Sequence, residues 1–340
     1  MSDELELLRA ADPAPAGEGR WRDRPLDAAA ERALNRLLHS ARTRRARRRL
    51  VLRAEAAVLA LVAVLAFTLT DAGSSPAVAA PSALVPRAVG AEPSLDGLAR
   101  IAAARARTAG PQDGPRRGSH LQSWSLSMGT GPDAASPVTV PEERITRWNP
   151  DGSGSELVVA TDPRHPGRPV IHDDGGRWRT VSDGRVLHRA TYRAGSGGSH
   201  GGPAARTEPP TDPGALRALL VSRYGAAGGD DAAAVPQLLT ALASFRQEWT
   251  PGPRETAAIV RLLADTRDLR PAGAVTDRLG RRGQAFVHDG PDGALDATRQ
   301  MVILDPHTGQ LLGTEITFTR ALPDFRVGAG QVLSYEAWMP

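Results

Sequence analysis

The chain has 340 residues and a formal net charge of +4, from 42 arginines, no lysine and 38 acidic residues. It contains no cysteine, which excludes disulfides, thiolate zinc sites, catalytic thiols and lipid attachment through an N-terminal cysteine. The absence of lysine excludes a Walker A phosphate loop, Schiff-base chemistry and a kinase-type phosphate lysine.

The excess positive charge is confined to the beginning of the chain. Residues 1–53 hold 13 arginines against 8 acidic residues, a net charge of +5, whereas residues 54–340 hold 29 against 30, a net charge of −1. A neutral body provides no broad positive field for phosphate groups. The high arginine content therefore does not indicate a nucleic-acid partner, and we expect none.

Residues 1–49 are predicted to form a cytoplasmic helical tail. A short helix is expected over 3–11, before Pro13 and Pro15, and apolar residues at spacings of three and four predict a second helix over 26–41. The apolar stripe of the second helix can bind a regulatory protein or lie on the lipid surface, and the pattern does not choose between these alternatives.

Residues 50–70 are predicted to be a transmembrane helix. Seven arginines lie between Arg42 and Arg53, and no basic residue follows until Arg87. This asymmetry predicts a single-pass protein of the cell membrane, with a cytoplasmic N-terminus and an extracytoplasmic C-terminal domain. As a helix, Leu50–Leu69 spans about 30 Å, the thickness of a hydrocarbon core. The segment Arg42–Arg53 is expected to contact anionic membrane lipid.

A cleaved secretory signal peptide is the alternative interpretation of this segment. Ala77-Val78-Ala79 has the small-x-small pattern of a cleavage site, and cleavage after Ala79 stays open. The 49 residues before the apolar segment and the long gap between Leu69 and Ala79 favour an uncleaved anchor.

Residues 94–340 are predicted to form one extracytoplasmic α+β domain, after a flexible linker at residues 71–93 that is rich in Ala, Pro and Ser. Ser94 can cap a first helix, which Gly110 ends. Period-two alternation and turn residues then predict antiparallel sheet with inserted helices. The expected strands are 121–128, 145–148, 156–161, 178–181, 185–188, 274–277, 284–288, 299–304, 310–320 and 332–338. The further expected helices are 213–224, 232–249 and 254–266.

Two hairpins are expected in the first half of this domain. Asn149 to Gly154 has turn-forming composition between two strands, and Ser182-Asp183-Gly184 is predicted to join the strands 178–181 and 185–188.

The histidines and one serine motif are the candidates for chemistry in this sequence. Gly197–Gly201 matches G-x-S-x-G with Ser199 in the middle, but it lies in a glycine-rich run without a preceding apolar strand, so a nucleophile elbow is not expected. The eight histidines show no pair at the spacing of helical metal ligands. His172-Asp173-Asp174 is interpreted as a solvated turn, since one turn rarely supplies the converging oxygens of a metal site.

Two acidic pairs complete the candidates. Glu142-Glu143 is interpreted as the entry to a strand and Asp230-Asp231 as the start of a helix. The sequence therefore assigns no catalytic residue, no cofactor-binding residue and no metal ligand.

Five tryptophans are the large aromatic residues of the outer domain. We expect them to build its core; the alternative is an apolar cavity in a curved sheet that opens to a lipid or a hydrophobic peptide. They are Trp124, Trp148, Trp178, Trp249 and Trp338.

Several stretches together carry a family resemblance. They are Asp3–Arg9 with Pro13-Ala14-Pro15, the arginine-rich flank of the apolar segment, Val275–Gly283 and Leu304–Gly313. With them the chain resembles an actinobacterial family of uncharacterised single-pass membrane proteins that are often encoded beside extracytoplasmic-function sigma factors. The resemblance implies signalling from outside the cell to transcription inside, and it implies no active site. The order of the outer elements is similar to that of lipoprotein-carrier-like half-barrels, which is an analogy of fold.

The sequence thus predicts a membrane-anchored extracytoplasmic binding or sensor protein, non-enzymatic and accessory to sigma-factor regulation. Its expected partners are a regulatory protein on the cytoplasmic tail and an envelope ligand or protein outside. One alternative is an envelope hydrolase acting on cell-wall or lipid substrates through Ser199 or carboxylates such as Asp173. A structural envelope scaffold is the other.

Overall fold

The computed structural model describes residues 81–88, 93–127, 138–161, 168–174, 177–180, 185–194, 207–224, 235–290 and 298–339. The predicted cytoplasmic tail 1–49 and transmembrane helix 50–70 lie outside these ranges and stay predictions. Among the helices that the structure does describe, none is both long and apolar enough to cross a bilayer.

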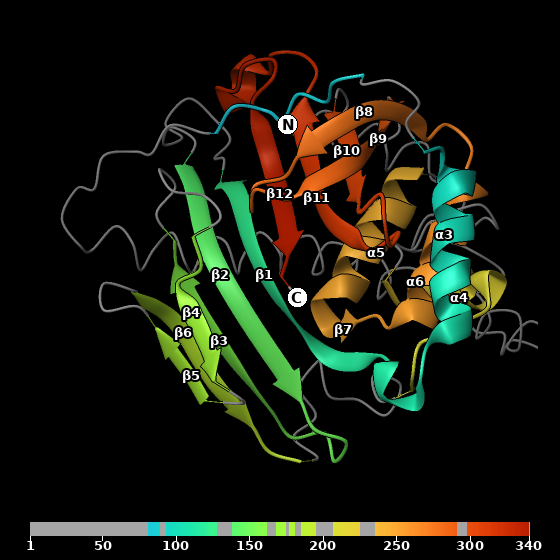
Figure 1. Cartoon of the computed structure of the whole chain (residues 1–340). Coiled ribbons are helices and arrows are strands. Elements are labelled where there is room, and N and C mark those ends of the chain that lie inside the picture. Colours follow the sequence, from blue (N-terminus) through green and yellow to red (C-terminus); the bar gives the residue numbers. More distant parts are fainter. Residues whose placement is uncertain are drawn as a thin grey trace, which may run out of the picture. The chain divides into compact units, whose positions relative to one another are not determined.

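Ten strands form one antiparallel sheet in the described part of the chain. Its order is β6-β3-β2-β1-β12-β11-β10-β9-β8, and the short β7 pairs with the beginning of β1 (Figure 1). A separate hairpin consists of β4 and β5. The strands are β1 (Arg116–Ser127), β2 (Val138–Trp148), β3 (Gly154–Ala160), β4 (Ile171–Asp174), β5 (Arg177–Thr180), β6 (Val186–Tyr192), β7 (Trp249–Thr250), β8 (Arg270–Thr276), β9 (Arg282–Gly290), β10 (Thr298–Leu304), β11 (Leu311–Phe318) and β12 (Val332–Trp338).

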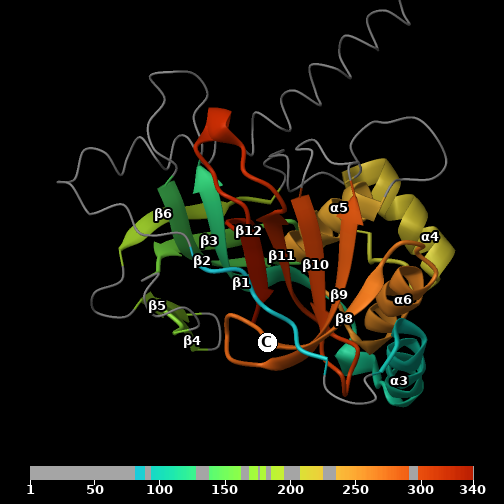
Figure 2. The same ribbon diagram turned by 90° about the horizontal axis from the view of Figure 1, so that it is seen from above.

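The helices gather on one side of the sheet, beside its β8–β12 half (Figures 1 and 2). Ser94 caps the first of them as predicted, because its Oγ accepts a hydrogen bond from the Gly97 N–H at 3.1 Å. The helices are α3 (Leu95–Thr108), α4 (Pro213–Leu219), α5 (Val235–Glu248) and α6 (Pro253–Ala264), and a π-helical turn, Leu220–Tyr224, continues α4.

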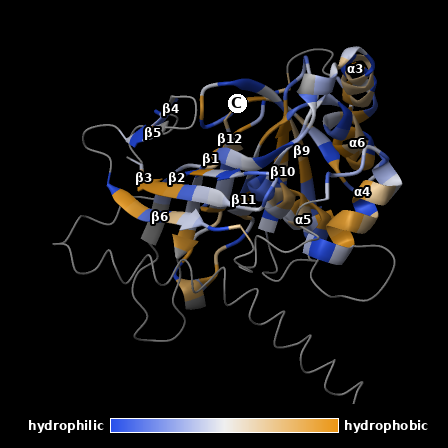
Figure 3. Cartoon of the chain, turned by 90° about the horizontal axis from the view of Figure 1, so that it is seen from below, coloured by the Kyte–Doolittle hydropathy of each residue, from blue (hydrophilic) through white to orange (hydrophobic). Residues whose placement is uncertain are grey.

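The main core lies between these helices and the sheet. Leu98 of α3, Phe245 of α5 and Leu263 of α6 are fully buried there with Phe286 and Trp338 from the strands. Figure 3 shows large hydrophobic stretches on α4 and α5, whereas hydrophilic and hydrophobic residues alternate along the strands. Burial of this apolar surface is the main source of stability for a domain without disulfides.

The core prediction for the tryptophans is confirmed for three of them. Trp124, Trp249 and Trp338 are buried, whereas Trp148 and Trp178 are partly exposed. At the level of fold class, the described residues form an α+β structure that is mostly antiparallel sheet with a few helices, as the sequence predicted.

The strand pairing differs from the prediction at one hairpin. The predicted hairpin across Ser182–Gly184 is wrong, because β5 pairs with β4 and β6 pairs with β3. The side of β3 opposite the helices is apolar at Leu157 and Val159, and the β4–β5 hairpin covers it with Ile171. Burial of this second apolar face therefore decides which strands pair, and turn-forming residues between two strands do not indicate such burial. The hairpin of β2 and β3 forms as predicted.

Two acidic clusters also differ from their interpretation. His172-Asp173-Asp174 is part of strand β4, where Asp173 lies opposite Trp178, and is not a turn. Glu142-Glu143 lies inside the eleven-residue strand β2 and not at its entry. Successive side chains of a strand point to opposite faces, so the two glutamates lie on different sides of the sheet.

Candidate functional site

The helix side of the sheet continues beyond the helices onto β2, β3 and β6. Arg144 lies opposite Leu121 of β1, which packs in the main core, and opposite Val158 of β3. Opposed residues point to the same face, so the Arg144 side chain lies on the helix side. The same register places four more polar side chains there. We call this surface the polar floor and define it by Glu142, Arg144, Glu156, Tyr192 and Glu336.

Arg144 is the centre of an ion network on the polar floor. Its Nη1 donates to Glu156 Oε1 at 2.9 Å and its Nη2 donates to Glu142 Oε1 at 3.1 Å. The Tyr192 hydroxyl donates to Glu156 Oε2 at 2.8 Å. The Arg144 side chain is 21 % exposed, and those of Glu142 and Glu156 are 13 % and 14 % exposed. Water therefore reaches the network, although most of its surface is buried.

The network changes the pKa of Arg144 and of Tyr192. Burial alone lowers the pKa of Arg144, but attraction to Glu142 and Glu156 outweighs it and the pKa is raised. Burial and the hydrogen bond to Glu156 raise the pKa of Tyr192 to about 12. Near neutral pH the floor therefore presents a fixed cation and a neutral phenol donor between carboxylates.

Glu336 lies where the polar floor meets α5. Its Oε1 accepts a hydrogen bond from Gln247 Nε2 at 2.5 Å, whereas its Oε2 is buried without a hydrogen bond to any described residue. Burial raises the pKa of Glu336 to about 7, against the lowering effects of Gln247 and Arg144. The Glu336 carboxyl consequently changes its charge near neutral pH.

An aromatic cluster borders the floor at the end of β2. The Arg117 guanidinium lies 5.4 Å from the Trp148 ring and 5.8 Å from the Trp249 ring, within the range of cation–π attraction. Trp148 also stacks on Tyr192, with ring centroids 5.0 Å apart. Gly154 leaves room for this stack, because a Cβ there would lie 2.3 Å from the Trp148 ring.

Glu143 is on the opposite side of the sheet and is fully buried. Its carboxylate lies 2.7 Å from His120 Nε2 and accepts hydrogen bonds from Gln122 Nε2 at 2.9 Å, Val170 N–H at 2.8 Å and Ile171 N–H at 3.1 Å. All its hydrogen-bonding capacity is used inside the protein. Glu143 therefore anchors the 168–171 segment and the hairpin behind it, which is a structural role.

The predicted candidates for chemistry do not come together. Asp173 forms an ion pair with Arg147, and His172 is exposed. Gly197–Gly201 with Ser199, and the pair Asp230-Asp231, lie outside the described residues. No group of three His, Asp or Glu side chains that could hold a metal ion occurs in the described ranges.

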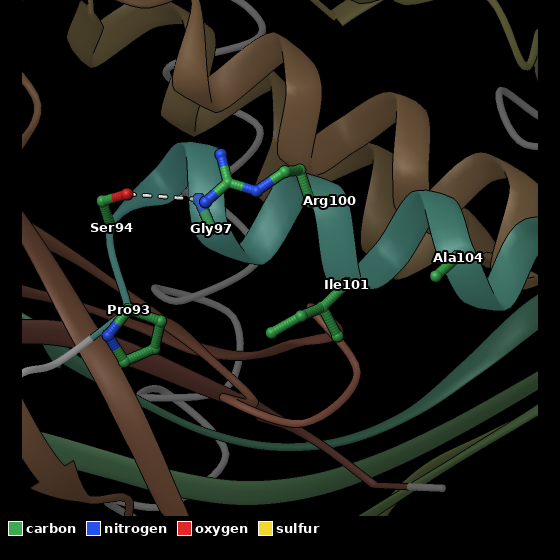
Figure 4. A pocket seen from close by; sticks show the side chains of 6 residues that line it. All are labelled: Pro93, Ser94, Gly97, Arg100, Ile101 and Ala104. Atoms are coloured by element: carbon green, nitrogen blue, oxygen red, sulfur yellow. Dashed lines mark hydrogen bonds between the residues drawn. The ribbon is translucent and has the colours of Figure 1, made fainter.

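Two surface hollows were compared with the polar floor. One, of about 610 Å³, follows the outer surface of α3, and Figure 4 shows its side chains along a single helix with Arg100 as the one charged group. The other, of about 580 Å³, lies between the loops near Gly110 and Pro210 and the start of α6 at Arg254. The polar floor differs from both hollows in that hydrogen bonds among Arg144, Glu156 and Tyr192 join three strands.

The polar floor was not predicted from the sequence. Its members are separated by up to 194 positions, from Glu142 to Glu336, and they meet only through the strand order. The sequence signal that does exist is the alternation Glu142-x-Arg144-x-Thr146 on one strand face. No protein-family model, curated protein or solved structure gives a significant match to this chain.

Proposed function

We propose that the chain is a single-pass membrane protein whose extracytoplasmic domain, residues 94–340, binds a polar segment of an envelope ligand or protein and catalyses no reaction. The polar floor is the binding surface in this proposal. The cytoplasmic tail 1–49 passes the signal to a regulatory protein, and the resemblance to proteins encoded beside sigma factors supports this part.

The observation that carries the proposal is the ion network of Arg144 with Glu142 and Glu156. It is partly exposed, preorganised by two strands, and lies beyond the described helices that cover the other half of the sheet. Preorganised charges lose little side-chain entropy when a partner binds, and aromatic and arginine side chains are enriched at binding surfaces. The aromatic cluster of Arg117 and Trp148 lies next to the network and enlarges the surface.

The polarity of the floor favours a polar ligand over an acyl chain. A lipid tail on this surface would desolvate three carboxyl groups and a guanidinium without replacing their hydrogen bonds to water. The order of the outer elements is similar to that of lipoprotein-carrier-like half-barrels. We propose a half-barrel of this kind for residues 94–340, with the polar floor as part of its lining.

Site-specific photo-cross-linking in intact cells tests the proposal. A photoreactive residue at Ser123, which lies opposite Glu336 on the floor side, is expected to give a discrete adduct. The matched control carries the photoreactive residue at the exposed position of His307, and it is expected to give no adduct. Arg144→Met keeps the aliphatic stem but removes the charge, so it is expected to abolish the Ser123 adduct while the protein stays folded.

Two outcomes oppose the proposal. Equal adducts from Ser123 and His307 would show nonspecific contact, and a Ser123 adduct that survives Arg144→Met would remove the network from recognition. A pull-down through residues 1–49 that recovers no sigma factor or other regulator would separately end the signalling part.

A further inference from the structure

Residues 81–88, which the sequence assigns to the flexible linker, lie across the sheet on the side away from the helices. Ser82 forms an isolated antiparallel bridge with Gln331, next to β12, and Arg87 forms another with Ala274 of β8. Figure 2 shows this segment in cyan, crossing the strands between its two attachment points. We call residues 81–88 the strap.

One buried ion pair holds the strap in its middle. The Glu315 side chain of β11 is 0 % exposed, pairs with Arg278, and accepts a hydrogen bond from the Leu84 N–H at 2.7 Å. Arg278 also donates to the Ser82 carbonyl at 2.8 Å. The same pair thus binds the strap backbone through both its acid and its base, and each bond is charge-assisted.

Aromatic rings fix the position of Arg278. Its guanidinium lies 5.1 Å from the Tyr335 ring and 5.9 Å from the Trp124 ring, and these two rings pack on each other at 5.4 Å. The sheet therefore holds Arg278 in place whether or not the strap is bound. We call Arg278 and Glu315 together the catch, since both bind the strap.

The far end of the strap depends on a glycine. The Arg87 N–H donates to the Ala274 carbonyl at 2.8 Å and the Ala274 N–H donates to the Arg87 carbonyl at 2.9 Å. Gly273 has φ +119°, and a Cβ there would lie 2.5 Å from the Arg87 carbonyl oxygen. Glycine at this position lets the two backbones approach closely.

The attachment is weaker than that of a strand. Two isolated bridges, the Arg278–Glu315 pair and the packing of the half-buried Leu84 against the apolar cluster around Val275 hold it, and Val85 in the middle of the strap is 74 % exposed. Segments with few buried apolar contacts open at a lower free energy than the strands beneath them. The strap can thus detach while the sheet stays folded.

We propose that the strap is a releasable latch that sets the length of the tether between membrane and outer domain, with Arg278 and Glu315 as its catch. This inference rests on the proposed membrane anchor at 50–70. With the strap docked, the free tether is the 11 residues 71–81; with it released, the tether is the 23 residues 71–93. The maximum reach rises from about 40 Å to about 80 Å, at up to 3.6 Å per residue.

The latch gives the outer domain two heights above the bilayer. A partner that holds the outer domain away from the membrane pulls on residue 81, so the Ser82 bridge and the Arg278 bond carry the load first. The mean extension of the tether also increases on release, since it is roughly 5 to 6 Å times the square root of the residue number, and the mean height rises by about 8 Å.

Hydrogen exchange and neutron reflectometry on the full chain in a supported bilayer test the latch. Glu315→Gln keeps the shape and an oxygen acceptor but removes the ion pair. The Leu84 and Arg87 amides are expected to exchange about tenfold faster in this variant, since a charge-assisted bond is lost. The protein layer is expected to move outward by a few Å, because a tenfold shift releases only part of the population. Asp289→Asn, which breaks the surface pairs with Arg270 and Arg299, is the matched control without either change.

A reversible disulfide between the strap and β8 distinguishes release of the strap from a general folding defect. The chain has no cysteine, so Arg87→Cys with Ala274→Cys supplies its only thiols, at a hydrogen-bonded pair whose Cα spacing of about 5.5 Å suits a disulfide. Oxidation of this pair in the Glu315→Gln background is expected to restore the protection of the Arg87 amide. It also shortens the released tether from residues 71–93 to residues 71–86, so the protein layer is expected to move back by part of its outward shift.

The outcomes separate the latch from the anchor. Unchanged exchange of Leu84 and Arg87 in Glu315→Gln, release without a change in height, or failure of the disulfide to lower the height of the released variant each overturn the latch. A full chain that does not insert into the bilayer overturns the proposed anchor, and with it the tether, while the exchange data still report whether Glu315 holds the strap.

Discussion

The carboxylate of Glu143 lies 2.7 Å from His120 Nε2 and is completely enclosed between the sheet and the 168–171 segment. Its neighbour Glu142 points to the other face and belongs to the polar floor. Two consecutive glutamates thus have different roles: one closes the fold behind β2 and the other contributes to the candidate binding surface.

Glu143→Ala is expected to destabilise the domain by about 3 to 4 kcal/mol, because the change leaves buried donors without an acceptor. Glu142→Ala is the matched control and is expected to cost about 1 kcal/mol or less, since its ion pair with Arg144 is reached by water. Urea unfolding of both variants measures the difference. Equal losses would contradict the anchoring role of Glu143.

Stability is expected to depend on pH through Glu336. Burial raises its folded pKa from 4.5 to about 7, so the folded state holds a proton that the unfolded state has released. The free energy of unfolding therefore falls as pH rises from about 4.5 to about 7. Discounted for partial exposure, the fall is about 2 kcal/mol.

Glu336→Gln removes this titration and keeps the side-chain shape. Unfolding at pH 5 and pH 8 is expected to show a smaller pH difference for the variant than for the wild type, with the gain in stability at pH 8. A variant whose pH profile runs parallel to that of the wild type would exclude Glu336 as the titrating group. Glu208→Gln, which changes an exposed carboxylate, serves as the control.

The strap predicts a difference between two glycines of positive φ. Gly273→Ala is expected to destabilise by about 3 kcal/mol, since it combines backbone strain with a collision with Arg87. Gly280→Ala has φ +80° with no atom within 4 Å of its new Cβ, so strain alone costs about 1 kcal/mol. Thermal unfolding measures both, and equal effects would show that the close approach of Arg87 is not needed.

The catch predicts a non-additive pair of substitutions. Glu315→Leu leaves Arg278 buried without its carboxylate and is expected to cost about 3 kcal/mol or more. Adding Arg278→Met removes the orphaned charge, so the double variant is expected to recover at least about 1 kcal/mol in a double-mutant cycle. Additive losses would mean that the two side chains do not stabilise each other.

Local patterns predicted much of the fold. Ser94 caps α3 as its sequence indicates, and the turn between Trp148 and Gly154 joins β2 to β3. A helix cap and a tight turn depend on residues that are close in the sequence. They can therefore be predicted without knowing the tertiary structure.

Long-range relationships were not accessible to the same reasoning. The β4–β5 pairing follows from burial of Ile171 on β3, and the strap meets Glu315 across 231 positions from Leu84. The polar floor likewise exists because β2 and β12 flank β1. Composition and spacing report which residues are polar or apolar, but the strand order decides which of them meet.

Accessibility of single cysteines in intact cells tests the membrane topology of the protein. The chain has no native cysteine, so Ser2→Cys and His307→Cys each carry one thiol for a membrane-impermeant maleimide. We expect labelling of the His307→Cys variant in intact cells, and labelling of the Ser2→Cys variant only after the membrane is opened. Labelling of Ser2→Cys from outside, or protection of His307→Cys until lysis, would contradict an extracytoplasmic binding domain on a cytoplasmic tail.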